Sequence, residues 1–288
     1  MVRPEAAGLR PVTRAPQLSA ASCDPLREIS ILDEHGAHRK IQVPSERALT
    51  LIIDDRELVT LMTLGAKPEL LVLGFLLNQR IVGDVTAIAS ISVDWRSGTA
   101  AVKSRAGKHD RNVAGVSGTP STRRGLGTAL RGSAAQIDAM KLPPAAAARI
   151  SQDTLLRVLD AMRHHDAIHR AAGSVHGCAL FQGADLWASV EDVSRHNGLD
   201  TIAGWMALHG VEGGDKILFT TGRLTGEMVM KAAYNGVPIV VSRNGVTAMG
   251  YDVAAKLGMT LFVRASNRRF ICCMGAERFD AAVGAQNR

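Results

Sequence analysis

Histidine side chains cluster near the middle of the chain, at a spacing that could support metal binding. His165 and His169 stand four residues apart at the end of an expected helix, which can place two imidazoles on one metal ion. No glutamate follows the first histidine as it does in an HExxH motif, and no cluster of carboxylates lies nearby in the sequence. The sequence therefore predicts no metal site.

The tripeptide His176-Gly177-Cys178 is arranged like the His-x-Glu of zinc deaminases. Cys178 stands where the acid would be, and the chain has no Cys-x-x-Cys pair to complete a zinc site, so hydrolytic deamination is excluded. Gly173 and Ser174 form a turn that can present His176 at the start of a strand. His176 and Cys178 are therefore candidates for a catalytic role, and a purely structural histidine is the alternative.

Two charged motifs stand where expected strands end and expected helices begin. Residues 191–197 place two acids before an Arg-His-Asn triplet, and residues 220–223 end a strand just before another helix. In open α/β sheets, strand ends and the helix N-termini that follow them collect anionic ligands. We expect His176, Arg195, His196 and Arg223 to converge on one cleft. The candidate ligand-binding residues of the two motifs are Arg195, His196, Asn197, Gly222 and Arg223.

The elements that must position these motifs differ between the two halves of the chain. Short β-branched runs separated by turns predict a small antiparallel sheet over residues 29–43 and 48–63. A helix that begins at Pro68 carries leucines on nearly every side and is expected to be buried, and alternation over residues 85–93 predicts a half-buried strand. A further helix is expected after Ser151, whose hydroxyl can cap it.

Beyond Gly173, strands and helices alternate, which predicts a layered α/β sheet. The fold class is α/β, or α+β overall. Strands are expected over residues 178–181, 186–190, 217–220, 237–241, 259–263 and 270–273, and helices over residues 195–208, 226–234 and 247–257.

These patterns divide the chain into four parts. Residues 1–27 are proline-rich and are expected to form a disordered tail, residues 28–103 a β-rich portion with a buried helix, residues 104–133 a Gly/Arg-rich loop, and residues 134–288 an α/β domain. Residues 96–131 contain eight basic residues and one acidic residue, and this excess accounts for the formal net charge of +7. The loop is expected to close over an anion.

Composition excludes several classes of protein. Aromatic residues make up 4% of the 288 residues, too few for a surface that stacks on bare bases, so no nucleic-acid partner is expected. The apolar stretch at residues 70–79 is much shorter than the roughly 20 residues that cross a bilayer, so no membrane span is expected. The four cysteines form no framework of spaced pairs, which fits a cytoplasmic protein.

Several runs of the sequence resemble the formate dehydrogenase accessory sulfurtransferase family (FdhD type). The resemblance covers roughly residues 40–280, in the family's order and spacing. The runs that carry it are SVHGCALF at 174–181, EDVSRHNGLD at 191–200, TGRLTGEMVMKAA at 221–233 and VTAMGYDVAAKLG at 246–258.

The resemblance implies a sulfur carrier that takes sulfur from a cysteine desulfurase and passes it to the bis(guanine dinucleotide) molybdenum cofactor of formate dehydrogenase. It also implies a C-terminal domain similar to the cytidine deaminase fold. The sequence does not decide whether the chain forms a homodimer. The segment that corresponds to the family's cofactor-binding residues is Phe262, Val263, Arg264, Ala265, Ser266 and Asn267.

The sequence departs from the family in the loop at residues 112–127, which contains no cysteine. Family members carry sulfur there as a persulfide, and persulfide chemistry needs a thiolate. Ser194, Gly198 and Val246 also differ from the family's usual residues. Two interpretations follow. The chain is either a sulfur carrier, which would have to use Cys178, Cys272 or Cys273, or it binds and delivers the cofactor or a guanine nucleotide such as GDP without carrying sulfur. Whether the chain is an enzyme depends on that choice.

Overall fold

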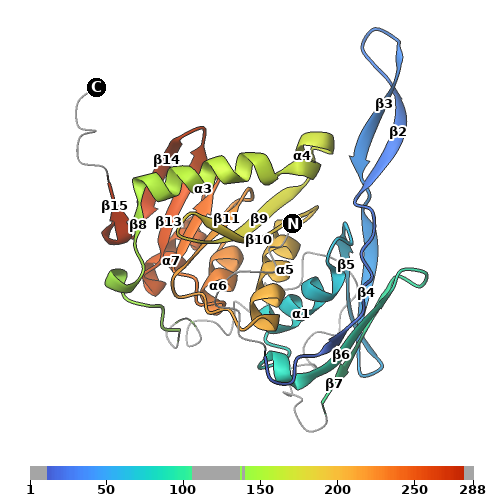
Figure 1. The fold of residues 1–288 in the computed structure, drawn as a ribbon, viewed down its shortest axis with the longest axis horizontal. Helices are drawn as coiled ribbons and strands as arrows, with labels where there is room; N and C mark the ends of the chain where they lie inside the picture. The colour runs from blue at the N-terminus through green and yellow to red at the C-terminus, as the bar shows by residue number, and fades with distance from the viewer. Residues whose placement is uncertain (1–11, 106–136, 138–139, 282–288) are drawn as a thin grey trace.

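The computed structural model describes residues 12–105, 137 and 140–281. The described residues form two sheets of more than two strands, a projecting hairpin and a set of helices between and around them (Figure 1). The predicted loop at residues 104–133 lies almost entirely outside the described residues.

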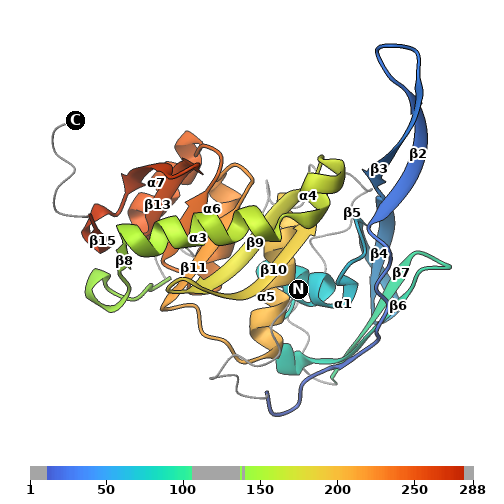
Figure 2. The ribbon, with the colours of Figure 1, turned by 45° about the horizontal axis from the view of Figure 1, so that its top comes forward.

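The N-terminal portion is built on a five-stranded sheet. Its strands lie in the order β1 (Gln17–Leu18), β6 (Ile88–Asp94), β7 (Thr99–Ser104), β4 (Arg47–Ile53) and β5 (Arg56–Thr63). Alternate residues of β4, among them Leu49 and Leu51, are buried against helix α1 (Pro68–Asn78), which is buried as predicted. Strands β2 (Leu26–Leu32) and β3 (His38–Pro44) form a separate hairpin that projects from the body (Figures 1 and 2).

Three features of this portion differ from the sequence predictions. The sheet is mixed rather than antiparallel, because β1 pairs with β6 and β4 pairs with β7 in parallel. Strand β7 was not expected, since its small residues show little apolar alternation. The predicted tail is wrong for residues 12–27: Ser19 donates from its hydroxyl to the carboxylate of Glu69 at 2.6 Å, and its backbone N–H bonds Ile91 O. These polar contacts hold the segment together with Val12, Leu18 and Ala21, which pack against the N-terminal core.

The C-terminal portion is a six-stranded sheet with helices on both faces (Figures 1 and 2). The strand order is β10 (Asp185–Asp192), β9 (His176–Gln182), β11 (Lys216–Thr220), β12 (Ile239–Ser242), β13 (Thr260–Ser266) and β14 (Arg269–Met274). Helices α5 (Arg195–Leu208), α6 (Gly226–Tyr234) and α7 (Ala248–Leu257) cover one face, and α3 (Gln152–His165) covers the other. The short elements are η1 (Val85–Ala87), η4 (Ala145–Ala147), β8 (Ile150–Ser151), α4 (Ala167–Ala172), η5 (Ala276–Arg278) and β15 (Phe279–Asp280).

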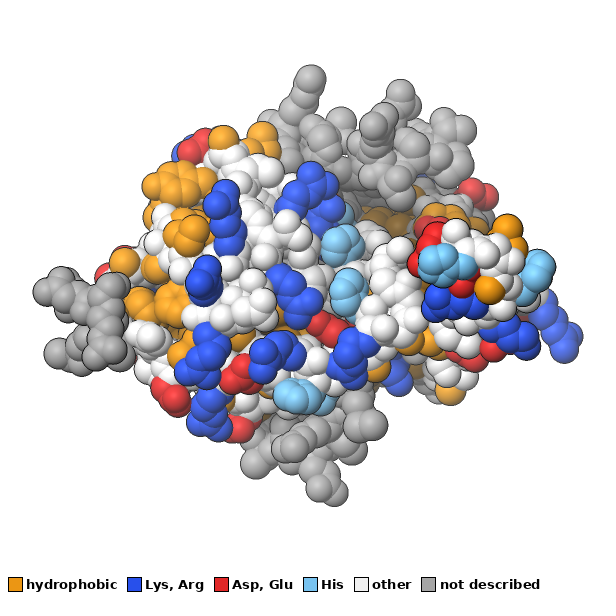
Figure 3. Space-filling view, turned by 90° about the horizontal axis from the view of Figure 1, so that it is seen from above, with side chains coloured by type: hydrophobic (Ala, Val, Ile, Leu, Met, Phe, Trp, Pro, Cys, Tyr) orange, Lys and Arg blue, Asp and Glu red, His pale blue; other side chains and the backbone are white. Residues whose placement is uncertain are grey.

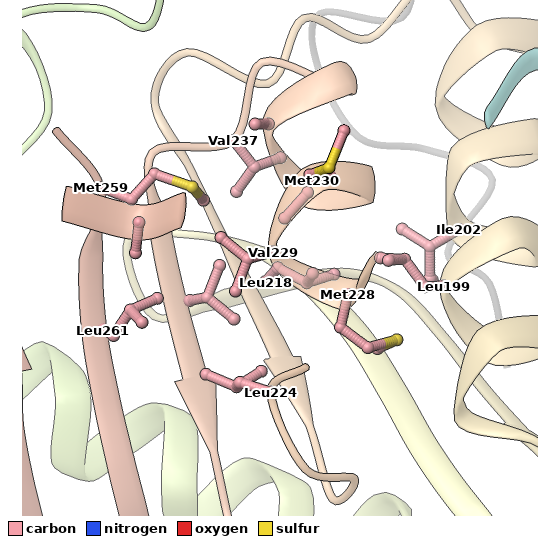
Figure 4. Packing of buried hydrophobic residues seen from close by; sticks show 14 of the residues in the cluster. Leu199, Ile202, Leu218, Leu224, Met228, Val229, Met230, Val237, Met259 and Leu261 are labelled. Carbon is pink, nitrogen blue, oxygen red and sulfur yellow. The ribbon is translucent and has the colours of Figure 1, made fainter. Parts of the chain in front are cut away.

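The core on the α5, α6 and α7 side interlocks helix and sheet side chains. Val229 of α6 packs among Leu218 of β11 and Leu261 of β13, with Leu199 and Ile202 of α5 beside them (Figure 4). Strands β11, β12 and β13 are parallel, so their carboxyl ends meet at one edge of the sheet. The layered α/β sheet is therefore confirmed, and this edge is where the charged motifs lie.

The two portions are joined where α1 crosses α5. A Cβ atom added to Gly74 would lie 1.7 Å from Asp200 O, and one added to Gly204 would lie 2.0 Å from Leu70 O, so the backbones touch. Beside the crossing, the Lys231 ammonium donates to Asp200 Oδ2 at 2.8 Å, and Asn78 Nδ2 donates to Asp200 Oδ1 at 2.7 Å. Because Lys231 and Asp200 are each 1% exposed, removing either partner would leave a buried charge.

Replacing Gly74 with alanine should force the two helices apart. We expect the free energy of unfolding of Gly74→Ala to fall by about 3 kcal/mol or more, measured by urea denaturation with tryptophan fluorescence. Gly245→Ala is the matched control, since nothing lies within 4 Å of a Cβ built there. Equal stability of the two variants would contradict the close crossing.

Candidate functional site

Four side chains from three separate segments meet at the carboxyl edge of the six-stranded sheet. We define His176, Arg195, His196 and Arg223 as the strand-end cluster. His176 begins β9, which runs antiparallel to β11, and its Nδ1 lies 3.4 Å from Thr221 Oγ1 just past the end of β11. Arg195 begins α5 and lies across the β11–α6 turn, where a Cβ on Gly222 would be 2.7 Å from the arginine Cβ and Cδ. The structure thus brings the predicted residues together, and it gives Gly222 the role of making room for Arg195.

The electrostatics of the strand-end cluster are dominated by positive charge. Burial, followed by the charges of Arg195 and Arg223, lowers the pKa of His176, which favours a neutral imidazole. Burial and the neighbouring Arg223 lower the pKa of Arg195 as well. Arg195 Nε is buried and has no hydrogen-bond partner among the described residues. Figure 3 shows arginine, lysine and histidine side chains gathered on this face of the molecule.

Glu227, in the first turn of α6, is the carboxylate that faces the cluster. Its Oε1 lies 3.2 Å from His196 Nδ1 and 3.8 Å from Lys231 Nζ. Burial raises the pKa of Glu227, but His196, Lys231 and Arg195 outweigh that effect and lower the pKa below its usual range. Glu227 is therefore ionised near neutral pH.

Asn197 does not belong to the cluster. It is buried, and its Nδ2 donates to Asp192 Oδ1 at 2.8 Å and to Met62 O at 2.7 Å. Asp192 also accepts from Thr63 Oγ1 at 2.6 Å, and burial raises its pKa despite these bonds. The predicted ligand contact by Asn197 is replaced by a structural role, because its amide ties β5 to the start of α5.

The segment from Phe262 to Asn267 is only partly available to a ligand. The side chains of Phe262, Val263 and Ala265 are 0%, 5% and 1% exposed and pack into the cores. Because β13 is buried on both faces, Phe262 and Val263 cannot contact a ligand directly, whereas Ala265 borders the cavity described next. Arg264 is exposed, and Ser266 and Asn267 line a cavity of about 320 Å³.

This cavity contains charged side chains that the sequence prediction missed. Arg243 donates from its guanidinium to Asp166 Oδ2 at 2.7 Å, and Arg170 donates to Arg163 O and His164 O at the end of α3. Arg243 directly follows β12, so the strand-end rule applied to Arg223 would also have found it. Phe219 and Leu159 supply apolar lining. The residues around the cavity are Leu159, Arg163, Asp166, His169, Arg170, Phe219, Arg243, Ala265, Ser266 and Asn267.

The cysteines provide no accessible reactive thiol beside the cluster. Cys178 is 0% exposed, and its Sγ donates to Thr220 Oγ1 at 3.4 Å. Burial raises the pKa of Cys178 to about 12. A Cβ on Gly198 would lie 2.9 Å from this sulfur, so the glycine makes room for the thiol. Cys272 and Cys273 are half-buried on β14, and burial raises the pKa of both.

Neither a metal centre nor a membrane-spanning helix is found within the described ranges. No group of three or more His, Cys, Asp or Glu residues is placed there to hold a metal ion. The helices of residues 12–105 and 140–281 are too short or too polar to cross a bilayer.

Comparison with known proteins identifies the family. The model of the FdhD/NarQ family matches residues 44–280. The chain belongs to the FdhD/NarQ family. The family resemblance drawn from the sequence motifs is therefore confirmed.

Curated relatives are named as sulfur carriers. The sulfur carrier protein FdhD of Halalkalibacterium halodurans is 29% identical over 246 residues, covering 81% of this chain and 86% of the relative. The protein of the same name from Bacillus pumilus is 30% identical over 230 residues, covering 77% of this chain and 85% of the relative.

A solved structure shares the fold. A crystal structure from Desulfotalea psychrophila, described as a formate dehydrogenase accessory protein, matches with a TM-score of 0.70 at 23% identity, covering 88% of this chain and 98% of that one. At this identity the match speaks for the FdhD/NarQ fold, and the expected likeness to the cytidine deaminase fold stays a prediction.

The burial of Cys178 predicts that it resists modification in the folded protein. With a pKa of about 12, roughly one thiol in ten thousand is ionised at pH 8. Iodoacetamide labelling with peptide mass spectrometry should modify Cys272 and Cys273 in native protein and leave Cys178 unmodified until urea is added. Labelling of native Cys178 at the rate of Cys272 would contradict its placement.

Proposed function

We propose that this chain is a formate dehydrogenase accessory protein that binds the bis(guanine dinucleotide) molybdenum cofactor, or a guanine nucleotide such as GDP, at the carboxyl edge of the six-stranded sheet. The observation that carries the proposal is Arg195, a half-buried guanidinium whose Nε has no hydrogen-bond partner among the described residues. A buried polar group without a partner is costly, so its retention argues for a ligand that completes it. Arginine is the side chain best suited to phosphate.

The fit between the site and an anionic cofactor extends beyond Arg195. Arg223 adds a second guanidinium close enough to lower the pKa of both Arg195 and His176. This mutual repulsion costs stability in the free protein, and a bound pyrophosphate would relieve it. Ser266, Asn267 and the exposed Arg264 lie farther along the same edge of the sheet, beside the cavity. They would face the rest of the nucleotide.

We propose further that the chain handles the cofactor without carrying sulfur on a cysteine. A persulfide carrier needs a thiolate that can reach both a donor and an acceptor. Cys178 is fully buried and its pKa is about 12, while residues 112–127 contain no cysteine. The second candidate function is the sulfur carrier named in the relatives, with Cys272 or Cys273 as the carrying thiol.

The partners of the chain follow from the proposed family role. Formate dehydrogenase would receive the cofactor, and a cysteine desulfurase would be a partner only if the carrier function is retained. Cytoplasmic localisation and assembly as a homodimer are parts of the same proposal.

Nucleotide binding tests the proposal directly. Calorimetric titration with GDP at low salt should show binding, and Arg195→Gln or Arg223→Gln should weaken it about tenfold or more, because each variant removes a charge-assisted hydrogen bond. Added KCl should weaken binding by the wild type. Arg56→Gln, on an exposed position of β5, is the matched control and should bind like the wild type.

Absence of both heat and a thermal shift with wild-type protein at low salt would overturn the proposal. Equal weakening by Arg56→Gln would show that the effect is general charge rather than this site.

A further inference from the structure

His196 is held between cations and one ionised carboxylate. Its Nδ1 is buried and lies 3.2 Å from Glu227 Oε1. Lys231, the other neighbour of Glu227, is 3.8 Å from that carboxylate and only 2.8 Å from Asp200. Because Lys231 is already paired with Asp200, Glu227 keeps the capacity to balance a positive charge on His196.

The charged and titratable groups around His196 come from every element of the site. Arg195 lies beside it on α5, His176 on β9, Arg223 in the β11–α6 turn, and Glu227 and Lys231 on α6. Asp192, at the end of β10, uses its carboxylate on Thr63 and Asn197. With Asp200 included, the three cationic side chains of Arg195, Arg223 and Lys231 stand beside three carboxyl groups, those of Glu227, Asp200 and Asp192.

A ligand with two negative charges shifts this balance. A bound pyrophosphate diester would add two negative charges beside these side chains. An imidazole that gains a proton offsets part of that added charge. His176 is the poorer acceptor, because burial and both arginines oppose its charged form.

We propose that binding of a pyrophosphate-bearing ligand at the strand-end cluster places a proton on His196, and that Glu227 is the positioning residue that holds the resulting imidazolium through its Nδ1–H. An acid in the buffer gives up the proton and an N–H bond forms at Nε2, while the Nδ1–H donates to Glu227 Oε1. This inference rests on the proposed function. It makes ligand binding tighter as the pH falls.

Proton uptake can be measured without the molybdenum cofactor. The probe is diguanosine diphosphate, whose pyrophosphate diester carries no group that titrates between about pH 5.5 and 8. Titration calorimetry at pH 7.0 in Tris and in PIPES, two buffers with different ionisation enthalpies, gives the number of protons bound per ligand. We expect uptake of about half a proton or more for the wild type.

Variants of His196 and Glu227 test whether His196 or a neighbouring group binds the proton. His196→Gln should bind the probe more weakly with uptake near zero, and Glu227→Gln should lose at least half of the uptake even if His196→Gln fails to fold. His35→Gln, on the exposed tip of the β2–β3 hairpin, is the matched control and should keep both affinity and uptake.

Each other outcome contradicts the inference. Equal binding heats in the two buffers for the wild type would overturn it while leaving the proposed function in place. Full uptake in His196→Gln would assign the proton to another group. No binding of the probe by the wild type would overturn the inference and the proposed function together.

Discussion

The contact of two helix backbones at Gly74 and Gly204 is the constraint on which the rest of the structure depends. It holds α1 against α5, and the buried Asp200–Lys231 pair beside it ties α5 to α6. Arg195 and His196 stand in the first turn of α5, and Glu227 in the first turn of α6. The crossing therefore sets the distance between the cations of the site and the carboxylate that faces them.

The same sequence motifs contribute residues to the contact between the two portions and to the strand-end cluster. In the run at 191–200, Asp192, Asn197 and Asp200 are buried in polar contacts between the two portions, whereas Arg195 and His196 belong to the strand-end cluster. A buried ion pair adds little net stability, but it allows few alternative arrangements of the helices it joins. Closely spaced like charges repel one another, so a site that contains them requires helices held in one fixed arrangement.

The features predicted most accurately from the sequence are those that depend on apolar periodicity and on helix capping. The bounds of α5 and α6 match the predictions residue for residue, and the convergence of His176, Arg195 and Arg223 followed from the rule that strand ends share an edge. The predictions were wrong where polar contacts between residues far apart in the sequence determine the structure. Asn197 was assigned to a ligand because its partner Met62 is 135 positions away, and β1 was missed because its anchor, Glu69, lies on α1. Gly74, the one glycine inside the buried helix that begins at Pro68, predicts from the sequence that a neighbour approaches closely there, and the structure identifies that neighbour as α5 at Asp200 and Gly204.

The central claim is that this chain holds the cofactor at the strand ends without carrying sulfur on its cysteines. The most direct measurement is to purify the chain from cells that make the guanine-dinucleotide cofactor, and to determine molybdenum and cysteine persulfide in the same sample by elemental analysis and intact mass spectrometry. We expect molybdenum bound to the wild type, its loss in an Arg195→Gln/Arg223→Gln double variant, and no reducible mass increase of about 32 Da on any cysteine. A persulfide that is lost when sulfur is delivered to the cofactor, or wild-type protein free of molybdenum, would contradict it.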